Sequence, residues 1–137
     1  SFHSPQFATE DGKARFHVTP LPEFHPGPDE FRLMTVRSEG QFNTVIYEEE
    51  DLYRGNMSRE VVMMAQADAD RVGVEEGSPV IVQTDIGEMC VSVAIVEILP
   101  GNLAMYYPEA NVLVPRRIDD KSKTPAFKSV LARIRVM

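Results

Sequence analysis

The sequence contains a single cysteine among its 137 residues and no apolar run long enough to cross a membrane. Because Cys90 cannot form a disulfide within the chain, the cysteine content is typical of a protein from a reducing compartment. A membrane span needs roughly 20 apolar residues, and the first residues, SFHSPQFATEDGK, contain no apolar signal region. We therefore expect a cytoplasmic protein with no membrane partner.

Basic residues are also scarce, with 14 Lys and Arg against 21 Asp and Glu and a formal net charge of -7. Binding to a nucleic-acid backbone strengthens with the number of phosphates neutralised, so this balance argues against a nucleic-acid partner. Hydrophobic residues make up 43% of the chain, which is enough to bury one core in a domain of this length. Any site for an anion must therefore be local.

Residues that could bind a metal or attack a substrate are scattered. The three histidines, His3, His17 and His25, match no compact zinc pattern. Cys90 lies inside an apolar run, so we expect a buried core thiol and neither a nucleophile nor a metal ligand. The acidic run at 48–51 lacks the spaced carboxylates and the glycine of a calcium loop. The sequence thus predicts no catalytic residue and no metal ligand in this chain.

The first 30 residues are expected to form an N-terminal arm or linker, because they contain half of the ten prolines. Within them, Asp11-Gly12 is a turn signal, and the flanking residues are compatible with a short hairpin over 7–16. The domain itself is expected over residues 31–137.

Six β-rich runs and one short helix are predicted after the arm. Ala65, Ala69 and Val72 share one helical face, and Gly73 is placed to end that helix in a left-handed conformation. The expected strands are 31–36, 61–64, 79–84, 88–98, 103–107 and 129–136. Since no βαβ rhythm and no internal repeat is present, this content favours a closed or nearly closed β-barrel over a doubly wound sheet.

The segment TVRSEGQFNT, residues 35–44, begins in the first predicted strand, and six of the eight residues after that strand, 37–44, have polar side chains. The guanidinium of Arg37 can bind an oxyanion or a flat heterocycle through two hydrogen bonds. Neutral donors and acceptors stand beside it at Ser38, Gln41, Asn43 and Thr44. This stretch is the first candidate binding segment.

The segment RRIDDKSKTPAFKS, residues 116–129, is the second candidate. It concentrates five of the fourteen basic residues, Arg116, Arg117, Lys121, Lys123 and Lys128, in an acidic protein. A solvated loop and an anion-binding loop explain this composition equally well. Both candidate segments adjoin predicted strands, so a barrel could bring them to one rim.

Four stretches of the chain resemble the C-terminal domain of molybdopterin oxidoreductases, in particular formate dehydrogenase alpha subunits. They are FRLMTVRSEGQFNT, MAQADADRVGVEEGSPVIVQTDIGEMCVSVAIVEILPGNLAM, PEANVL and DDKSKTPAFKSVLARIRV. The resemblance implies a mainly β fold, a double-psi β-barrel with one or two short helices. It also implies a domain that helps to bind bis-(molybdopterin guanine dinucleotide) carrying molybdenum or tungsten.

The resemblance also indicates which residues contact the cofactor. By the family pattern these are Arg37, Ser38, Gln41, Asn43, Asn111, Phe127 and Lys128. The metal ligand, any iron–sulfur cluster and the catalytic residues are then expected in the remainder of the oxidoreductase catalytic subunit. The isolated domain would not be an enzyme, and the whole protein would oxidise formate or carry out a related two-electron reaction.

Two alternatives use the same barrel. One is a stand-alone double-psi barrel that serves as a protein-interaction or substrate-recognition module. The other is a small self-processing decarboxylase, which needs a Gly-Ser cleavage site. Gly77-Ser78 is the one such dipeptide, and it lies in a predicted turn before Pro79.

Overall fold

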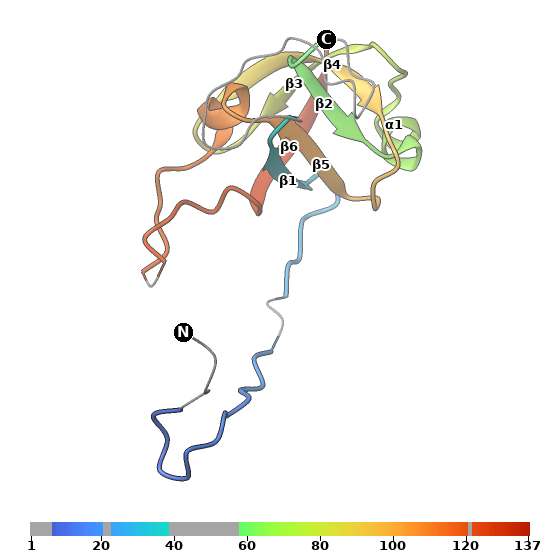
Figure 1. Cartoon of the computed structure of the whole chain (residues 1–137). Helices are drawn as coiled ribbons and strands as arrows, with labels where there is room; N and C mark the ends of the chain where they lie inside the picture. Colours follow the sequence, from blue (N-terminus) through green and yellow to red (C-terminus); the bar gives the residue numbers. More distant parts are fainter. Residues whose placement is uncertain (1–6, 21–22, 39–57, 121) are drawn as a thin grey trace.

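The computed structural model of the chain describes residues 7–20, 23–38, 58–120 and 122–137. These residues form six strands, one α-helix and one 3-10 helix (Figure 1). In chain order they are β1 (Phe31–Val36), β2 (Val61–Met64), α1 (Gln66–Val72), β3 (Pro79–Gln83), β4 (Glu88–Ile95), β5 (Asn102–Tyr106), η1 (Glu109–Leu113) and β6 (Val130–Val136). The candidate positions Gln41 and Asn43 and the acidic run at 48–51 lie outside the described residues.

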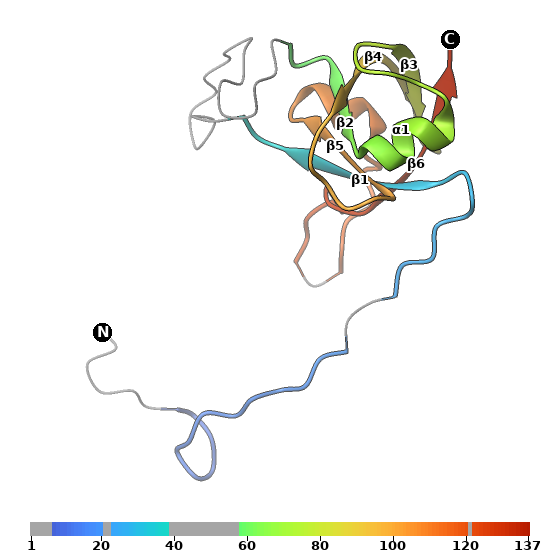
Figure 2. The same ribbon diagram turned by 90° about the vertical axis from the view of Figure 1, so that its right-hand side faces the viewer.

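The six strands close into a barrel in the order β1-β5-β2-β4-β3-β6. Two neighbouring pairs are parallel, β1 with β5 and β2 with β4, and the other four are antiparallel. The predicted closed barrel is therefore confirmed. Figure 2 shows the barrel turned by 90°, with α1 against its side.

The barrel interior is filled by apolar side chains that alternate along the strands. On β1, Phe31 and Leu33 are fully buried. Strands β3 and β4 likewise bury valines at every second position. Strand β2 is buried on both faces, because Met63 packs outward into a second cluster that contains Tyr106. The buried run at 61–64 is thus a strand covered on both sides, as its uninterrupted apolar sequence suggests.

Helix α1 ends where its sequence predicts. Gly73 has a φ of 80°, in the left-handed region that glycine adopts without steric cost, and its N–H donates to the carbonyl of Ala69. Gly77, with a φ of 79°, likewise lies in a turn before β3. The Gly77-Ser78 dipeptide is therefore ordinary turn structure here.

Two sequence predictions on β4 were wrong. The strand ends at Ile95 instead of residue 98, because its partner β2 ends at Met64, opposite Ile95. Cys90 is exposed and not a core thiol, since Val91 and Val93 face the barrel interior and alternation then directs Cys90 outward. Its Sγ lies 3.3 Å from Sδ of Met137.

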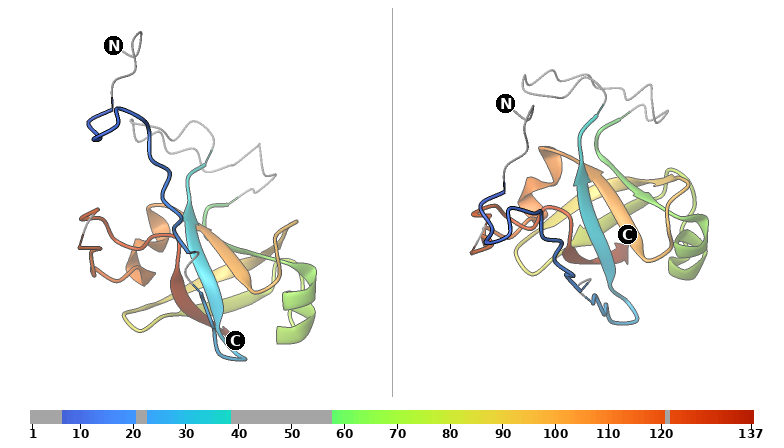
Figure 3. Two further views of the ribbon diagram at one scale, coloured as in Figure 1. Left: turned by 90° about the horizontal axis from the view of Figure 1, so that it is seen from below. Right: turned by 60° about the horizontal axis from the view of Figure 1, so that its bottom comes forward.

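The described parts of the N-terminal arm run away from the barrel in Figures 1 and 2 and overlap it in the views of Figure 3. The turn at Asp11-Gly12 forms, with the Gly12 N–H donating to the Thr9 carbonyl, but within residues 7–20 neither flank pairs as a strand. The hairpin is therefore absent there. Closer to β1 the chain is tied to the barrel, where Arg71 donates to the carbonyl of Pro28. The role of residues 1–30 as a linker stays a prediction.

Candidate functional site

The parallel pairing of β1 with β5 builds one side of the candidate site. Val36 and Tyr106 are register partners at the ends of these strands, so the next residues, Arg37 and Tyr107, emerge side by side. The Tyr107 N–H donates to the carbonyl of Val36 at 2.8 Å, which continues the ladder by one step. The exposed guanidinium of Arg37 lies over the Tyr107 ring, 5.6 Å from its centroid.

The segment before β6 supplies the opposite side. The backbone N–H of Thr35 donates to the carbonyl of Phe127 at 2.9 Å, and the ammonium of Lys128 donates to the carbonyl of Thr35. These bonds hold Phe127 and Lys128 against the end of β1. The result is a pocket of about 380 Å³ lined by Thr35, Val36, Arg37, Tyr107, Phe127 and Lys128.

Asn111 lies in an adjoining pocket of similar volume, about 380 Å³. Phe127 lines both pockets. The second pocket depends on close packing between the β3–β4 turn and η1, since a Cβ on Gly87 would lie only 2.5 Å from the Val112 carbonyl oxygen. The structure thus brings Arg37, Phe127 and Lys128 together and places Asn111 next to them.

Ser38 is placed differently from its neighbour Arg37. It is only 6% exposed, and its hydroxyl oxygen accepts a 2.6 Å hydrogen bond from Arg59. Its side chain therefore contacts a buried network beside the pocket and is absent from the pocket lining.

Arg59, a buried arginine two residues before β2, is a site residue that the sequence does not reveal. Its guanidinium donates to both carboxylate oxygens of Glu109, at 2.7 and 3.0 Å, and lies over the ring of Tyr106. Its sequence signal is weak: an Arg-Glu pair precedes the apolar run VVMM, a pattern equally compatible with a surface arginine. Only the fold shows that Arg59 is 8% exposed.

The electrostatics of Glu109 reflect this pairing. Burial alone raises the pKa of the Glu109 carboxyl, but hydrogen bonds from Arg59 and the backbone, with the attraction of the guanidinium, outweigh it. The pKa therefore lies below its ordinary value, and Arg59 faces a carboxylate at neutral pH.

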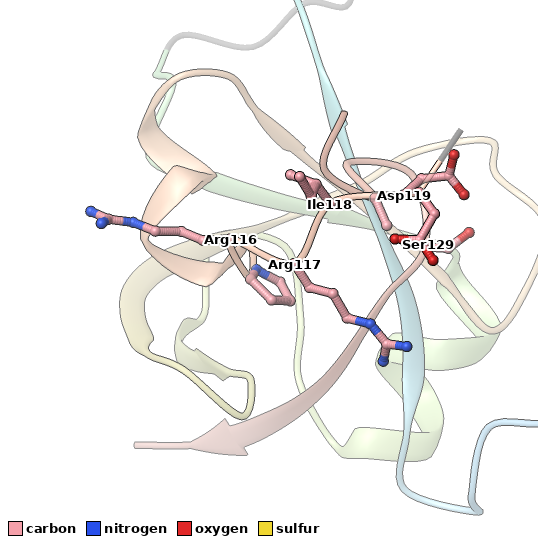
Figure 4. Close-up of a pocket in the computed structure, with 8 residues that line it drawn as sticks. Arg116, Arg117, Ile118, Asp119 and Ser129 are labelled. Atoms are coloured by element: carbon pink, nitrogen blue, oxygen red, sulfur yellow. The ribbon is translucent and has the colours of Figure 1, made fainter. Parts of the chain in front are cut away.

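The basic segment at 116–129 forms a loop that projects from the barrel between η1 and β6 (Figure 1). It folds back on itself, with Ile118 bridging to Pro125 and the Asp119 N–H donating to Thr124. Arg116 and Arg117 line a pocket of about 760 Å³. Their side chains point in different directions (Figure 4). Because Asp119 and Asp120 also line this pocket, its charge is mixed. Lys121 lies outside the described residues, and of the four described basic residues in this segment only Lys128 reaches the pocket beside Arg37.

Within the described ranges, no group of three or more His, Cys, Asp or Glu side chains is arranged to hold a metal ion. In the same residues, no helix has the length and apolar character required to cross a bilayer.

The molydopterin dinucleotide binding domain family has a model that matches residues 31–131, the whole barrel up to the start of β6. The chain belongs to this family. Uncharacterized oxidoreductase Rv2900c of Mycobacterium tuberculosis is 36% identical over 141 residues, covering 94% of this chain and 18% of the relative. Protein YdeP of Escherichia coli K12 is 34% identical over 108 residues, covering 72% of this chain and 14% of that protein. This molybdopterin-dinucleotide-binding domain therefore spans less than a fifth of the length of these curated relatives.

Solved structures agree on the fold of this molybdopterin-dinucleotide-binding domain. Acetylene hydratase from Pelobacter acetylenicus aligns with a TM-score of 0.61 at 14% identity, over 78% of this chain and 18% of that one. A computationally designed double-psi β-barrel protein aligns with a TM-score of 0.50 at 14% identity, over 79% of this chain and 96% of the design. The predicted double-psi β-barrel is confirmed.

Proposed function

We propose that this domain forms one wall of the site for bis-(molybdopterin guanine dinucleotide) in the catalytic subunit of a larger molybdenum or tungsten oxidoreductase. The observation that carries the proposal is the pocket at the end of β1. There Arg37 and Phe127–Lys128, about ninety residues apart in sequence, line one cavity beside Tyr107. The remainder of the catalytic subunit would complete the site.

The residues at this pocket fit such a ligand. Its pyrophosphates and pterin oxygens are acceptors, which suit the guanidinium of Arg37 and the ammonium of Lys128. Its flat rings suit the aromatic faces of Tyr107 and Phe127. Asn111, in the adjoining pocket, offers both a donor and an acceptor for the edge of a heterocycle. We assign Ser38, Gln41 and Asn43 to the same site on the resemblance described above.

In the whole enzyme, the bound group supplies two-electron redox chemistry at its metal, while this domain binds and orients it. We propose formate oxidation or a related two-electron reaction as the activity, on the likeness of the four sequence stretches to formate dehydrogenases. The metal ligand and any iron–sulfur cluster would come from the rest of the subunit. A cytoplasmic location is consistent with the one unpaired cysteine.

The test is Arg37→Ala in the oxidoreductase that carries this domain. Guanine nucleotide and metal per protein are measured in that variant, and the melting temperature is measured on the 137-residue chain. We expect the cofactor content to fall, because a charge-assisted contact worth roughly 1.5 to 3 kcal/mol is removed. The stability of the domain should change by no more than about 0.5 kcal/mol, since Arg37 is exposed.

Arg135→Ala is the matched control. Arg135 is also an exposed arginine, paired with Glu88 on the barrel wall, and it does not line the candidate pocket. It should leave the cofactor content unchanged. Full cofactor content in the Arg37→Ala protein would reject this pocket as the binding site.

A further inference from the structure

We propose that Arg59 is a positioning residue that fixes Arg37 and Tyr107 relative to each other, and that Ser38 acts through it. This inference rests on the proposed function of the pocket at the end of β1. It concerns a residue that does not line that pocket.

The geometry places one guanidinium across the two chain segments that form the pocket side. Nη1 of Arg59 donates to the hydroxyl of Ser38 at 2.6 Å, and Nη2 donates to the carbonyl of Tyr107 at 2.6 Å. Ser38 directly follows Arg37, and the guanidinium of Arg37 lies over the ring of Tyr107. Arg59 therefore links the chain segment that carries Arg37 to the backbone of Tyr107. The separation of Arg37 from the Tyr107 ring therefore depends on Arg59.

Arg59 is itself held in one orientation. Glu109 accepts hydrogen bonds from Nε and Nη2, and the Tyr106 ring lies 5.0 Å from the guanidinium carbon. Only 8% of Arg59 is exposed, and a buried charge is tolerated when a partner and several hydrogen bonds satisfy it. Glu109 begins η1, which also carries Asn111, so the same guanidinium links η1 to the pocket.

The planar fork of arginine is required for this arrangement. Three nitrogens of Arg59 donate in fixed directions to a hydroxyl, a carbonyl and a carboxylate. A lysine carries the same charge on a single nitrogen, so it cannot maintain all three contacts at once. Arg59→Lys should therefore preserve the charge that Glu109 faces and lose the link between Ser38 and Tyr107.

Arg71 provides a matched control at the other end of β1. Its guanidinium also contacts one carboxylate, one backbone carbonyl and one aromatic ring, those of Asp68, Pro28 and Phe31. Arg71 is more exposed than Arg59, at 43% of its side chain, and does not line the pocket beside Arg37. Arg71→Lys therefore tests whether loosening any arginine network of this barrel affects the cofactor.

The experiment measures how fast the purified oxidoreductase loses guanine nucleotide during dialysis, together with its melting temperature. For Arg59→Lys we expect the loss rate to rise about tenfold, the change produced by about 1.4 kcal/mol of binding free energy. For Arg71→Lys the loss rate should equal that of the wild type, whatever its melting temperature. Equal loss rates in all three proteins would overturn the positioning role.

Ser38→Ala keeps the proposal testable if Arg59→Lys fails to fold. It removes one hydroxyl and should raise the loss rate in the same direction. If Ser38 acts through Arg59, the double variant should lose nucleotide no faster than Arg59→Lys alone, because the two changes break one link. Additive effects would show that Ser38 contacts the ligand independently and would overturn that part of the proposal.

The Arg37→Ala protein distinguishes a failure of the positioning role of Arg59 from a failure of the proposed cofactor site. A raised loss rate in Arg37→Ala with a normal rate in Arg59→Lys would reject the positioning role and leave the proposed function intact. Normal rates in both would reject the pocket itself as the cofactor site.

Discussion

The carboxylate of Asp68 accepts a hydrogen bond from the backbone N–H of Gly101, with 2.7 Å between Oδ2 and the nitrogen. This contact joins α1 to the turn that precedes β5, and Oδ1 of the same carboxylate pairs with Arg71 at 3.1 Å. Asp68 is 3% exposed, so its oxygens depend on these protein donors in place of water. Asp68 therefore anchors the turn before β5 to the helix.

Asp68→Ala should lower the free energy of unfolding by about 1 to 3 kcal/mol, because the Gly101 N–H and the Arg71 guanidinium lose their acceptor. Urea denaturation of the chain measures this loss. Asp70→Ala is the control, since Asp70 is exposed on the same helix and contacts Gln66. It should change the stability by no more than about 0.5 kcal/mol. Equal effects of the two substitutions would contradict the role given to Asp68.

The domain should lose stability in acid, and protonation of the Glu109 carboxylate should account for part of this loss. The folded pKa of this carboxyl lies below its ordinary value of 4.5, so the folded state binds fewer protons than the unfolded state. Its contribution is therefore present above pH 4.5 and is lost as the pH falls through the folded pKa. Melting temperatures measured from pH 7 to pH 3 should decline less steeply in Glu109→Gln than in the wild type.

Glu30 provides the comparison for this pH dependence. Its pKa is also lowered, by the hydrogen bond from the Gly27 N–H and by Arg133, which together outweigh its desolvation. Glu30→Gln should therefore also reduce the loss of stability in acid. In the double variant the reductions caused by Glu30→Gln and Glu109→Gln should add. A Glu109→Gln profile parallel to that of the wild type would show that the pairing with Arg59 contributes no pH dependence.

Cys90 should react with a thiol reagent in the native protein, because its side chain is exposed on the outer face of β4. We expect one thiol per chain to be labelled without denaturant, as followed by absorbance or mass spectrometry. Cys90→Ser should change the free energy of unfolding by no more than about 0.5 kcal/mol. Labelling that appears only after denaturation would restore the original prediction of a core thiol.

Local patterns along the chain account for most of the secondary structure. β-rich apolar runs predicted the strands, and Gly73 marked the end of α1, because side-chain alternation and left-handed glycine are properties of a few consecutive residues. The 3-10 helix at Glu109–Leu113 was not predicted, since such a short turn has no periodic signal. The error at Cys90 came from treating an apolar run as uniformly buried when its strand has an outer face.

For the candidate site, the sequence indicated residues but not their arrangement. Charge and the family resemblance indicated Arg37 and Lys128 as candidate binding residues. Arg37 follows a predicted strand and Lys128 precedes one. Their meeting in one pocket depends on β1 having both β5 and β6 as neighbours. Such long-range pairing has no signal in a short stretch of residues.

The sequence by itself determined that these 137 residues are acidic and β-rich, with a polar segment after the first strand, because composition and short-range periodicity carry that information. Only the tertiary structure decided that the strands close with two parallel pairs and that the Ser38 hydroxyl accepts a hydrogen bond from Arg59 beside the pocket. It also decided that Arg59 is buried against Glu109 and Tyr107. These features arise from contacts between residues about 20 to 100 positions apart, which the packing of the whole barrel selects together.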